Sequence, residues 1–243
     1  MRLVDTHAHL DGLIDVAGAI ERARLMGVTA VVAVGASSQA NTRILEIAQE
    51  HDFVYPAIGI HPAEAEAASD EDLRFVDENA DACVAIGEIG LDYSYGVDKE
   101  LQKTIFKRML EIAVRHDKPV SLHSRYAWDE VLSCALDQGI KRGVFHWYTG
   151  PLDTLEKILD RGYLISATLA VEYSVKHREA IERAAVDSIL LETDTPVKYR
   201  GVASEPSHII RVADAVAAIK NIAVERLAEI TTSNACKLFG AQF

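Results

Sequence analysis

The sequence predicts an α/β fold of the (β/α)8 TIM-barrel type, and three features of the chain support this prediction. Eight short apolar segments rich in β-branched residues recur along it, and amphipathic segments with helical spacing separate them. The length of 243 residues suits one large domain built from these units. Finally, polar side chains of the kinds that bind metals stand at the ends of the apolar segments.

Continuous apolar segments are typical of parallel strands that are covered on both faces. Residues 16–26 carry apolar side chains at helical spacing and stop at Gly27, which suits a helix end. Residues 101–112 predict a second helix, and the following proline ends it. Helices over 206–220 and 224–239 complete the chain. The predicted strands span residues 2–5, 29–35, 53–60, 82–90, 119–124, 143–147, 163–168 and 188–194.

A doubly wound open sheet is the main structural alternative, because it shares the alternation of strands and helices. That fold usually has a glycine-rich phosphate-binding loop after its first strand, whereas this chain has DTHAHLDG there. No linker, low-complexity segment or repeat beyond the strand–helix unit interrupts the sequence. We therefore expect residues 1–243 to form a single barrel domain.

The composition narrows the classes of function. No segment has the roughly 20 apolar residues of a membrane span, and no signal peptide opens the chain, so we expect a cytoplasmic protein. The net charge of −12 disfavours a protein that grips long duplex DNA through many phosphates. Three widely spaced cysteines in apolar surroundings predict buried thiols rather than disulfides. Nothing predicts an obligate protein partner.

Potential metal ligands follow most of the predicted strands. His7 and His9 are separated by one alanine, so in an extended strand both point to the same face. A lone histidine at a strand end is more often a satisfied polar group than a ligand, but here several such residues coincide on the face where TIM barrels build active sites. The others stand at strand ends: His61 at the end of strand three, Glu88 of strand four, His123 of strand five, His146 of strand six and Asp194 of strand eight.

Four imidazoles and two carboxylates exceed what one tetrahedral site needs, so we expect two divalent metal ions. Mixed nitrogen and oxygen ligands suit Mg, Mn, Zn or Ni alike. Ions about 3.5–4 Å apart can share a hydroxide. Asp194 is also a candidate to accept the proton of an attacking water. The predicted ligands are His7, His9 and Asp194 for one ion, His123 and His146 for the other, and Glu88 as the bridge.

The remaining histidines have a simpler interpretation. His51, His116 and His177 lie on or near predicted helices among charged residues, so we expect them to be solvated at the surface. His208 begins a helix and is not assigned to the site.

The motifs together resemble those of the TatD-type metal-dependent deoxyribonucleases of the amidohydrolase superfamily. The resemblance runs from Asp5 to Gly240 through DTHAHL, GIHP, GEIGLDY, HSR, the histidine of strand six, LLETDTP and EITTSNACKLFG. It implies a TIM barrel with one or two metals and hydrolysis of a DNA substrate, including 3′–5′ trimming of single-stranded ends. It implies the same six ligands, with His61 at the substrate phosphate.

Two departures from the family pattern concern the substrate. Trp147 and Tyr148 replace a cysteine–phenylalanine pair that is frequent after the strand-six histidine. The segment after strand eight is shortened; it keeps Arg200 but has Ala203 and Ser204 where basic or amide residues are common.

Several residues near the ligands are candidates for binding substrate. Arg125 follows His123 by two residues and can reach a phosphate oxygen, although an ion pair with Asp129 is an equal alternative. Asp92 is expected to support a ligand or fix a loop. Four aromatic residues offer faces for unpaired bases, of which we expect one or two to be used. They are Tyr93, Tyr95, Trp147 and Tyr148, and the predicted substrate contacts are His61, Arg125, Tyr93 and Arg200.

Two other functions remain open from the sequence. An amidohydrolase-type enzyme could use the same metals on a small cyclic amide, lactone or phosphoester, but such enzymes commonly bridge their ions with a lysine at the end of strand four, where this chain has Glu88. A binding protein that has lost catalysis is the other possibility, although no predicted ligand is missing.

Overall fold

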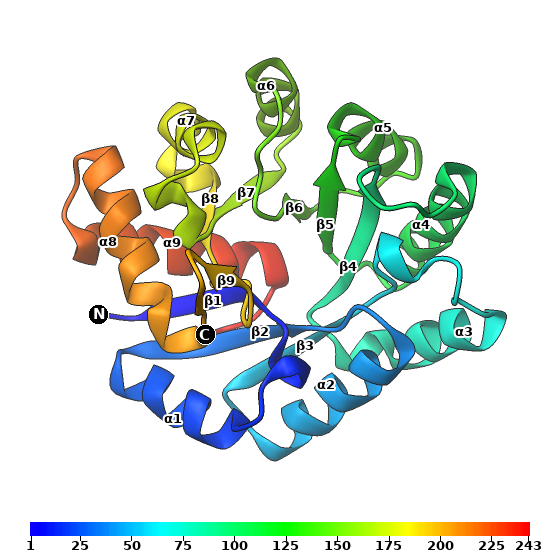
Figure 1. The fold of residues 1–243 in the computed structure, drawn as a ribbon, viewed down its shortest axis with the longest axis horizontal. Helices are drawn as coiled ribbons and strands as arrows, with labels where there is room; N and C mark the ends of the chain where they lie inside the picture. The colour runs from blue at the N-terminus through cyan, green and yellow to red at the C-terminus, as the bar shows by residue number, and fades with distance from the viewer.

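Eight parallel strands lie in chain order from β1 to β8 in the computed structural model, which describes residues 1–243. The helices surround the strands (Figure 1). The two ends of the series meet at a seam, where Ala8 pairs in parallel with Thr195 and the Asp194 N–H donates to the His7 carbonyl over 2.9 Å. The predicted (β/α)8 TIM barrel is confirmed.

All eight predicted strands overlap observed ones, but β3, β6, β7 and β8 are shorter than predicted, and β6 and β8 end before His146 and Glu192. In the other direction, β1 and β4 continue beyond their predicted ends to Ala8 and Asp92. The strands of the barrel are β1 (Leu3–Ala8), β2 (Val28–Val34), β3 (Val54–Ile58), β4 (Ala85–Asp92), β5 (Val120–Arg125), β6 (Gly143–Phe145), β7 (Leu164–Ala167) and β8 (Ile189–Leu191). The α-helices are α1 (Val16–Leu25), α2 (Ser38–Glu50), α3 (Asp70–Asn79), α4 (Lys99–Arg115), α5 (Trp128–Asp137), α6 (Leu152–Asp160), α7 (Val175–Arg183), α8 (Ile209–Lys220) and α9 (Val224–Phe239). Short 3-10 helices are η1 (Leu10–Gly12), η2 (Pro62–Glu64), η3 (Ala80–Ala82), η4 (Leu169–Glu172), η5 (Val186–Ser188) and η6 (Pro206–His208).

The core has two apolar layers, which follow from the alternation of side chains along each strand. In β2, Val31 and Ala33 belong to the large cluster between strands and helices, whereas Val32 and Val34 belong to a smaller cluster. Phe239 of α9 joins this smaller cluster, and α9 packs against β1 and β8. The helix therefore closes one end of the barrel interior.

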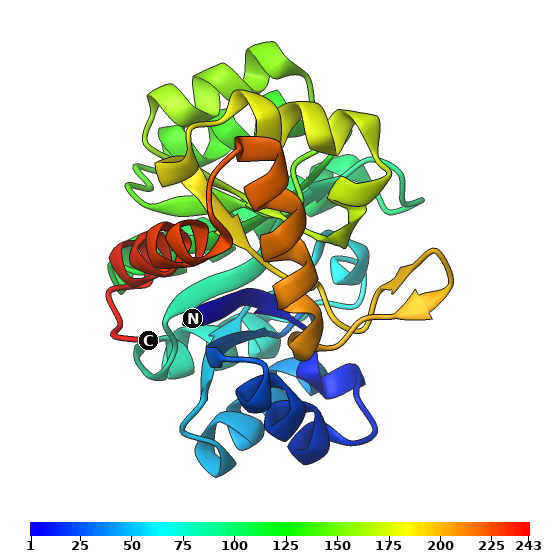
Figure 2. The ribbon, with the colours of Figure 1, turned by 90° about the vertical axis from the view of Figure 1, so that its left-hand side faces the viewer.

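The opposite end carries an extra hairpin that the sequence did not predict. It consists of β9 (Lys198–Tyr199) and β10 (Val202–Ala203), with Arg200 and Gly201 in the turn at positive φ. Figure 2 shows this hairpin projecting on one side of the molecule, with α9 and both chain termini on the other. Tyr199 anchors it, because its buried ring places the hydroxyl 3.0 Å from the Thr193 carbonyl, to which it donates.

Two predictions about individual side chains are decided by burial. Cys83 and Cys134 are buried, Cys236 is half-buried, and all three are free thiols, so the expected lack of disulfides is confirmed. The prediction that His177 is a solvated surface residue is wrong. Its ring is fully buried, accepts from the Thr168 N–H at 3.1 Å and donates to the Tyr148 carbonyl at 2.8 Å.

No helix is long and apolar enough to span a membrane.

Candidate metal centre and substrate pocket

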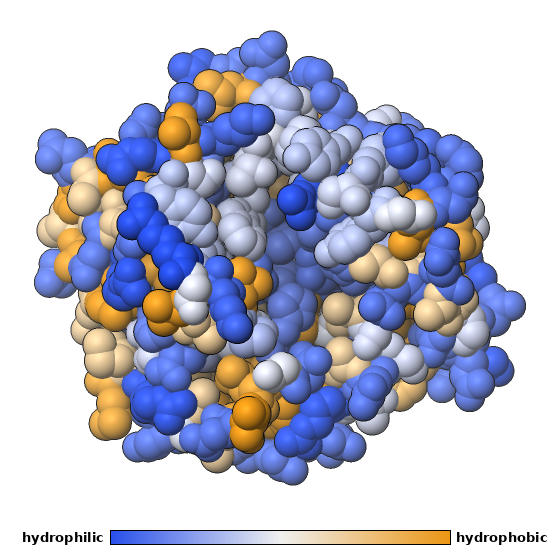
Figure 3. Space-filling model, in the orientation of Figure 1, coloured by the Kyte–Doolittle hydropathy of each residue, from blue (hydrophilic) through white to orange (hydrophobic).

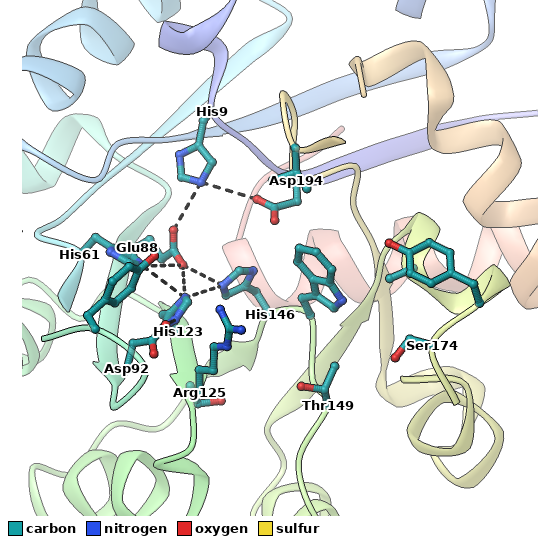
Figure 4. A pocket seen from close by; sticks show the side chains of 16 residues that line it. His9, His61, Glu88, Asp92, His123, Arg125, His146, Thr149, Ser174 and Asp194 are labelled. Carbon is teal, nitrogen blue, oxygen red and sulfur yellow. Dashed lines mark hydrogen bonds and ion pairs between the residues drawn. The ribbon is translucent and has the colours of Figure 1, made fainter. Parts of the chain in front are cut away.

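The carboxylate of Glu88 lies at the centre of the predicted ligands (Figure 4). Its Oε2 is 3.5 Å from His7 Nε2 and 3.3 Å from His9 Nε2. Its Oε1 is 2.6 Å from His123 Nδ1 and 2.7 Å from His146 Nε2. Each oxygen therefore faces one of the two ligand groups that the sequence predicted.

Asp194 completes the first group across the seam. Its Oδ1 lies 3.8 Å from His7 Nε2 and 3.6 Å from His9 Nε2. The rings of His7 and His146 stack with centroids 4.2 Å apart, which keeps the two groups close together. The donor atoms of His7, His146 and Asp194, like those of His7, His9 and Glu88, lie within 4.8 Å of one another, a spacing that suits a bound ion.

The outer nitrogens of His7, His9 and His123 have hydrogen-bond partners, which fits these three residues to a cation. His9 Nδ1 lies 2.9 Å from the Val34 carbonyl and His123 Nε2 lies 2.8 Å from Asp92 Oδ2, so both outer nitrogens carry the hydrogen and donate it. The inner nitrogen of each neutral ring then presents a lone pair to the cluster. Asp92 thus supports a predicted ligand, as expected.

A buried carboxylate that the sequence analysis missed stands behind His146. Glu192 Oε1 lies 3.5 Å from His146 Nδ1 and accepts from the Trp147 N–H at 3.0 Å, while its Oε2 has no partner. The signal for it was available, since Glu192 precedes Asp194 in the LLETDTP motif.

His61 is oriented differently from the other histidines of the cluster. Its Nδ1 accepts from the Ala63 N–H at 3.1 Å, so the hydrogen of the neutral ring must sit on Nε2. Burial lowers the pKa of His61 to about 3, against the opposing effect of the Glu88 charge, and the ring stays neutral. Its Nε2–H therefore points into the cluster as a donor, 3.7 Å from Glu88 Oε1.

The ionisation of the cluster is dominated by Glu88. Burial alone would raise the pKa of Glu88, but nearby histidine charges, that of His146 first, and the hydrogen bonds from His123 and His146 hold it well below its ordinary value. Burial opposes a charge on His9, yet its contact with Glu88 and the charges of Glu88 and Asp194 raise the pKa of His9 to about 9. The site therefore gathers positive charge around a buried carboxylate, and a divalent cation would take the place of those protons.

The approach of β4 to β5 depends on a glycine. Gly90 has φ of 151°, and a Cβ added there would lie 1.9 Å from the His123 carbonyl oxygen. Only glycine allows this contact, and it brings Glu88 and His123 together.

A cavity of about 510 Å³ opens over the cluster. Figure 3 shows a hydrophilic hollow near the centre of this face. All of the predicted ligands except His7 line this cavity. Thr149 and Ser174 also line it, and they lie on the side of His146 that is away from His61 (Figure 4). Its remaining lining residues are His61, Asp92, Tyr95, Ser124, Arg125, Trp147, Ala170, Tyr173 and Val197.

Residues 4–240 match the family described as TatD related DNase. The chain belongs to this family. A metal-dependent hydrolase of Bacillus subtilis, YabD, described as uncharacterized, is 34% identical over 98% of each chain. A human protein named deoxyribonuclease TATDN3 is 31% identical over 98% of this chain and 94% of its own. The solved structure of YJJV, a TatD homologue from Escherichia coli, superposes with a TM-score of 0.92 at 29% identity over 98% of each chain.

The protein is thus a metal-dependent hydrolase of the TatD family, and its barrel brings together donor groups able to hold the metal.

The predicted substrate contacts of this TatD protein are distributed unevenly. Arg125 lines the cavity, and Figure 4 shows its guanidinium directed toward His146 and His123. The alternative pairing with Asp129 is wrong, because Asp129 binds Lys157 at 2.9 Å instead. Arg200 does not line the cavity; its guanidinium carbon lies 5.1 Å from the Tyr173 ring centre.

Two of the four aromatic candidates line the cavity, and two do not. Tyr95 and Trp147 line the cavity. Tyr93 does not, because its hydroxyl donates to Glu130 and the Lys99 ammonium lies 4.3 Å from its ring centre. Tyr148 is fully buried and donates to the Pro151 carbonyl at 2.7 Å, so it is not among the one or two candidates that offer a face to a base.

Proposed function

We propose that this protein is a metal-dependent deoxyribonuclease that trims single-stranded DNA from its 3′ end. The convergence of the predicted ligands on Glu88 supports the proposal most directly, because it leaves two groups of donor atoms side by side at the floor of one cavity. The Nε2–H of His61 and the guanidinium of Arg125 supply donors for a phosphodiester beside them. The printed name of the human relative agrees with this substrate.

Each residue then has a role in hydrolysis. Two divalent ions, with Mg, Mn, Zn and Ni as candidates, would be held by the six ligands and would supply Lewis acidity and a lowered pKa for water. Asp194 accepts the proton of the attacking water, and Glu88 holds both groups of ligands in register. His61 and Arg125 donate to the non-bridging oxygens, where charge grows in the transition state. The water oxygen bonds to phosphorus, the P–O3′ bond breaks, and the 3′ oxygen takes a proton.

The charge of the molecule favours a short, single-stranded substrate. Arg125 is the only lysine or arginine that lines the cavity, and the net charge is −12. A long duplex would meet repulsion over most of the surface, whereas a strand end needs to place only its last phosphodiester at the metals.

A second candidate function is the hydrolysis of a small cyclic amide, lactone or phosphoester. The cavity volume of about 510 Å³ favours it, because this size is typical of small-molecule sites. Glu88 in place of a bridging lysine counts against it.

The test uses a 3′-labelled single-stranded DNA with magnesium or manganese and with a chelator. Stepwise loss of label that the chelator abolishes, and that a Glu88→Gln variant lacks, is the expected result. If the DNA stays intact with every metal and the protein hydrolyses a lactone, cyclic amide or small phosphoester, the second candidate function takes the place of the proposed nuclease function. A purified protein without metal or activity would leave a binding function.

A further inference from the structure

Trp147 is held in an unusual backbone conformation at the wall of the cavity. Its φ is 41°, a region that bulky side chains rarely adopt. Its N–H donates to Ser166 Oγ at 2.9 Å and to Glu192 Oε1 at 3.0 Å, and both acceptors are buried. Such a conformation persists only where the surroundings over-determine it, which is typical of functional sites.

The ring of Trp147 also has a contact that restrains it, with a second aromatic side chain. Its centroid lies 5.5 Å from that of the buried Tyr199 ring, and the Tyr199 hydroxyl is bonded to the Thr193 carbonyl. The indole thus packs against Tyr199, and it remains half-buried in the cavity lining.

The neighbouring lining has a matching chemical character. Tyr173 is 42% exposed, and Arg200 lies over its ring at 5.1 Å. Small apolar and hydroxyl side chains complete this part of the lining, and none of them is charged. We name it the aromatic slot, and it consists of Trp147, Thr149, Ala170, Tyr173, Ser174 and Val197.

Aromatic faces with adjacent hydroxyl groups suit a planar heteroaromatic ring that has a few hydrogen-bonding atoms at its edge. The slot also adjoins the metal centre, since Trp147 directly follows the ligand His146 and Val197 lies three residues after Asp194. A base in the slot would thus belong to a nucleotide whose phosphate is at the metals.

We propose that the aromatic slot holds the base of the 3′-terminal nucleotide, stacked on Trp147. This inference rests on the proposed nuclease function and deepens it, because it assigns a specific site to the base. The released nucleoside 5′-monophosphate then occupies the slot and the phosphate site together.

The first experiment uses the two tryptophans of the chain. In a Trp128→Phe variant Trp147 is the only tryptophan, so its fluorescence reports on the slot alone. Titration with dAMP and magnesium quenches this fluorescence to saturation, whereas 2-deoxyribose 5-phosphate does not. Calorimetry then gives dAMP an affinity about tenfold or more above that of the sugar phosphate, as expected for one stacked base.

Substitution of Trp147 separates stacking from phosphate binding. Trp147→Ala weakens dAMP binding about tenfold and leaves 2-deoxyribose 5-phosphate within about twofold, while Trp147→Phe restores most of the loss. Tyr173→Ala, at the second aromatic residue of the slot, tests the same discrimination without altering the strained backbone at Trp147. Circular dichroism verifies the folding of each variant.

The inference is overturned by equal affinity for dAMP and the sugar phosphate, by no binding of either, or by equal weakening of both in the two alanine variants. The proposed function is tested separately on labelled DNA. If DNA with an abasic 3′ end is trimmed as fast as intact DNA, the base site is contradicted but the nuclease function stands. If dAMP stacks on Trp147 but DNA is not hydrolysed, the base site stands and the nuclease function is contradicted.

Discussion

Glu88 reaches the two ligand groups with separate oxygens, so its removal should affect both metal positions. We expect Glu88→Ala to lose bound metal while the protein stays folded, because the apolar clusters on either side of the strands do not include this residue. Elemental analysis and circular dichroism measure the two effects. Glu66→Ala, at an exposed carboxylate, is the matched control. Full metal occupancy and activity in Glu88→Ala would contradict the bridging role.

His61 should behave differently from the ligands because its cavity-facing nitrogen carries a hydrogen. We expect His61→Ala to keep its metal and to lose about tenfold to hundredfold in kcat/KM, the loss expected for one hydrogen bond to a charged group, about 1.5–3 kcal/mol. His123→Ala is the comparison, with loss of metal as the expected outcome. Equal metal loss in both variants would make His61 a ligand instead.

Sequence reasoning identified most of the site residues in short motifs at strand ends, but it missed Glu192, which lies in one of these motifs, and Tyr173. Glu192 and Tyr173 come from segments that meet His146 and Trp147 only after the barrel closes. His177 was misassigned, and Tyr148 was kept as a candidate, because burial depends on tertiary packing; each turns into the protein and donates to a backbone carbonyl.

At the level of elements, the contact between β4 and β5 should be sensitive to a single methyl group. Gly90→Ala places a Cβ against the His123 carbonyl, so we expect a loss of about 1–3 kcal/mol in the free energy of unfolding and weaker metal binding. Gly96→Ala is the matched control, since a Cβ there meets nothing within 4 Å. Urea denaturation compares them, and equal stability of the two variants would contradict the argument.

The packing of α3 against α4 includes a pH-dependent contact. His116 lies 2.8 Å from Asp77 and 3.0 Å from Asp81, and the hydrogen bond that it donates to Asp77, followed by the one that it donates to Asp81, raises the pKa of His116 above its ordinary value. Because the pKa of His116 is higher in the folded than in the unfolded protein, protonated His116 stabilises the fold fully below the unfolded value of about 6.5. This stabilisation is lost as the pH rises through the folded-state pKa.

We therefore expect the difference in thermal midpoint between the natural protein and His116→Gln to be larger at about pH 5.5 than at about pH 9, with a contribution below about 1 kcal/mol. Differential scanning calorimetry measures it. A difference that grows with pH would show that the contact acts through packing rather than charge.

The elements themselves were predicted well where burial on both faces gives a strong signal. All eight barrel strands were recognised for this reason, and so was α9, whose apolar face repeats at helical spacing. The hairpin of β9 and β10 was missed because strands of two residues carry no periodicity. The ends of β6 and β8 were placed too late, since apolar and ligand residues adjoin there without a turn signal.

The whole molecule should show a weak salt dependence when it binds a strand end. Each phosphate neutralised on single-stranded DNA contributes a slope of about −0.7 to log K against log salt. Arg125 and Arg200 are the basic side chains beside the cavity, so we expect a slope of about −1.4. Fluorescence anisotropy in a KCl series measures it on the metal-loaded natural protein, with a strand whose terminal phosphorothioate linkage resists hydrolysis. Arg125→Gln should reduce the slope by about half, and a much steeper slope in the parent would indicate an extended binding surface elsewhere.

The seam between β1 and the segment after β8 has a consequence for biosynthesis. His7 and His9 leave the ribosome long before Asp194 and the backbone that pairs with Ala8, which lie far along the chain. Until then β1 exposes an unpaired edge, and α9, which comes after Asp194 in the chain, has not covered the barrel interior. A nascent chain that has not yet been extended through Asp194 therefore cannot assemble the full set of ligands, and loading with metal becomes a late step of maturation.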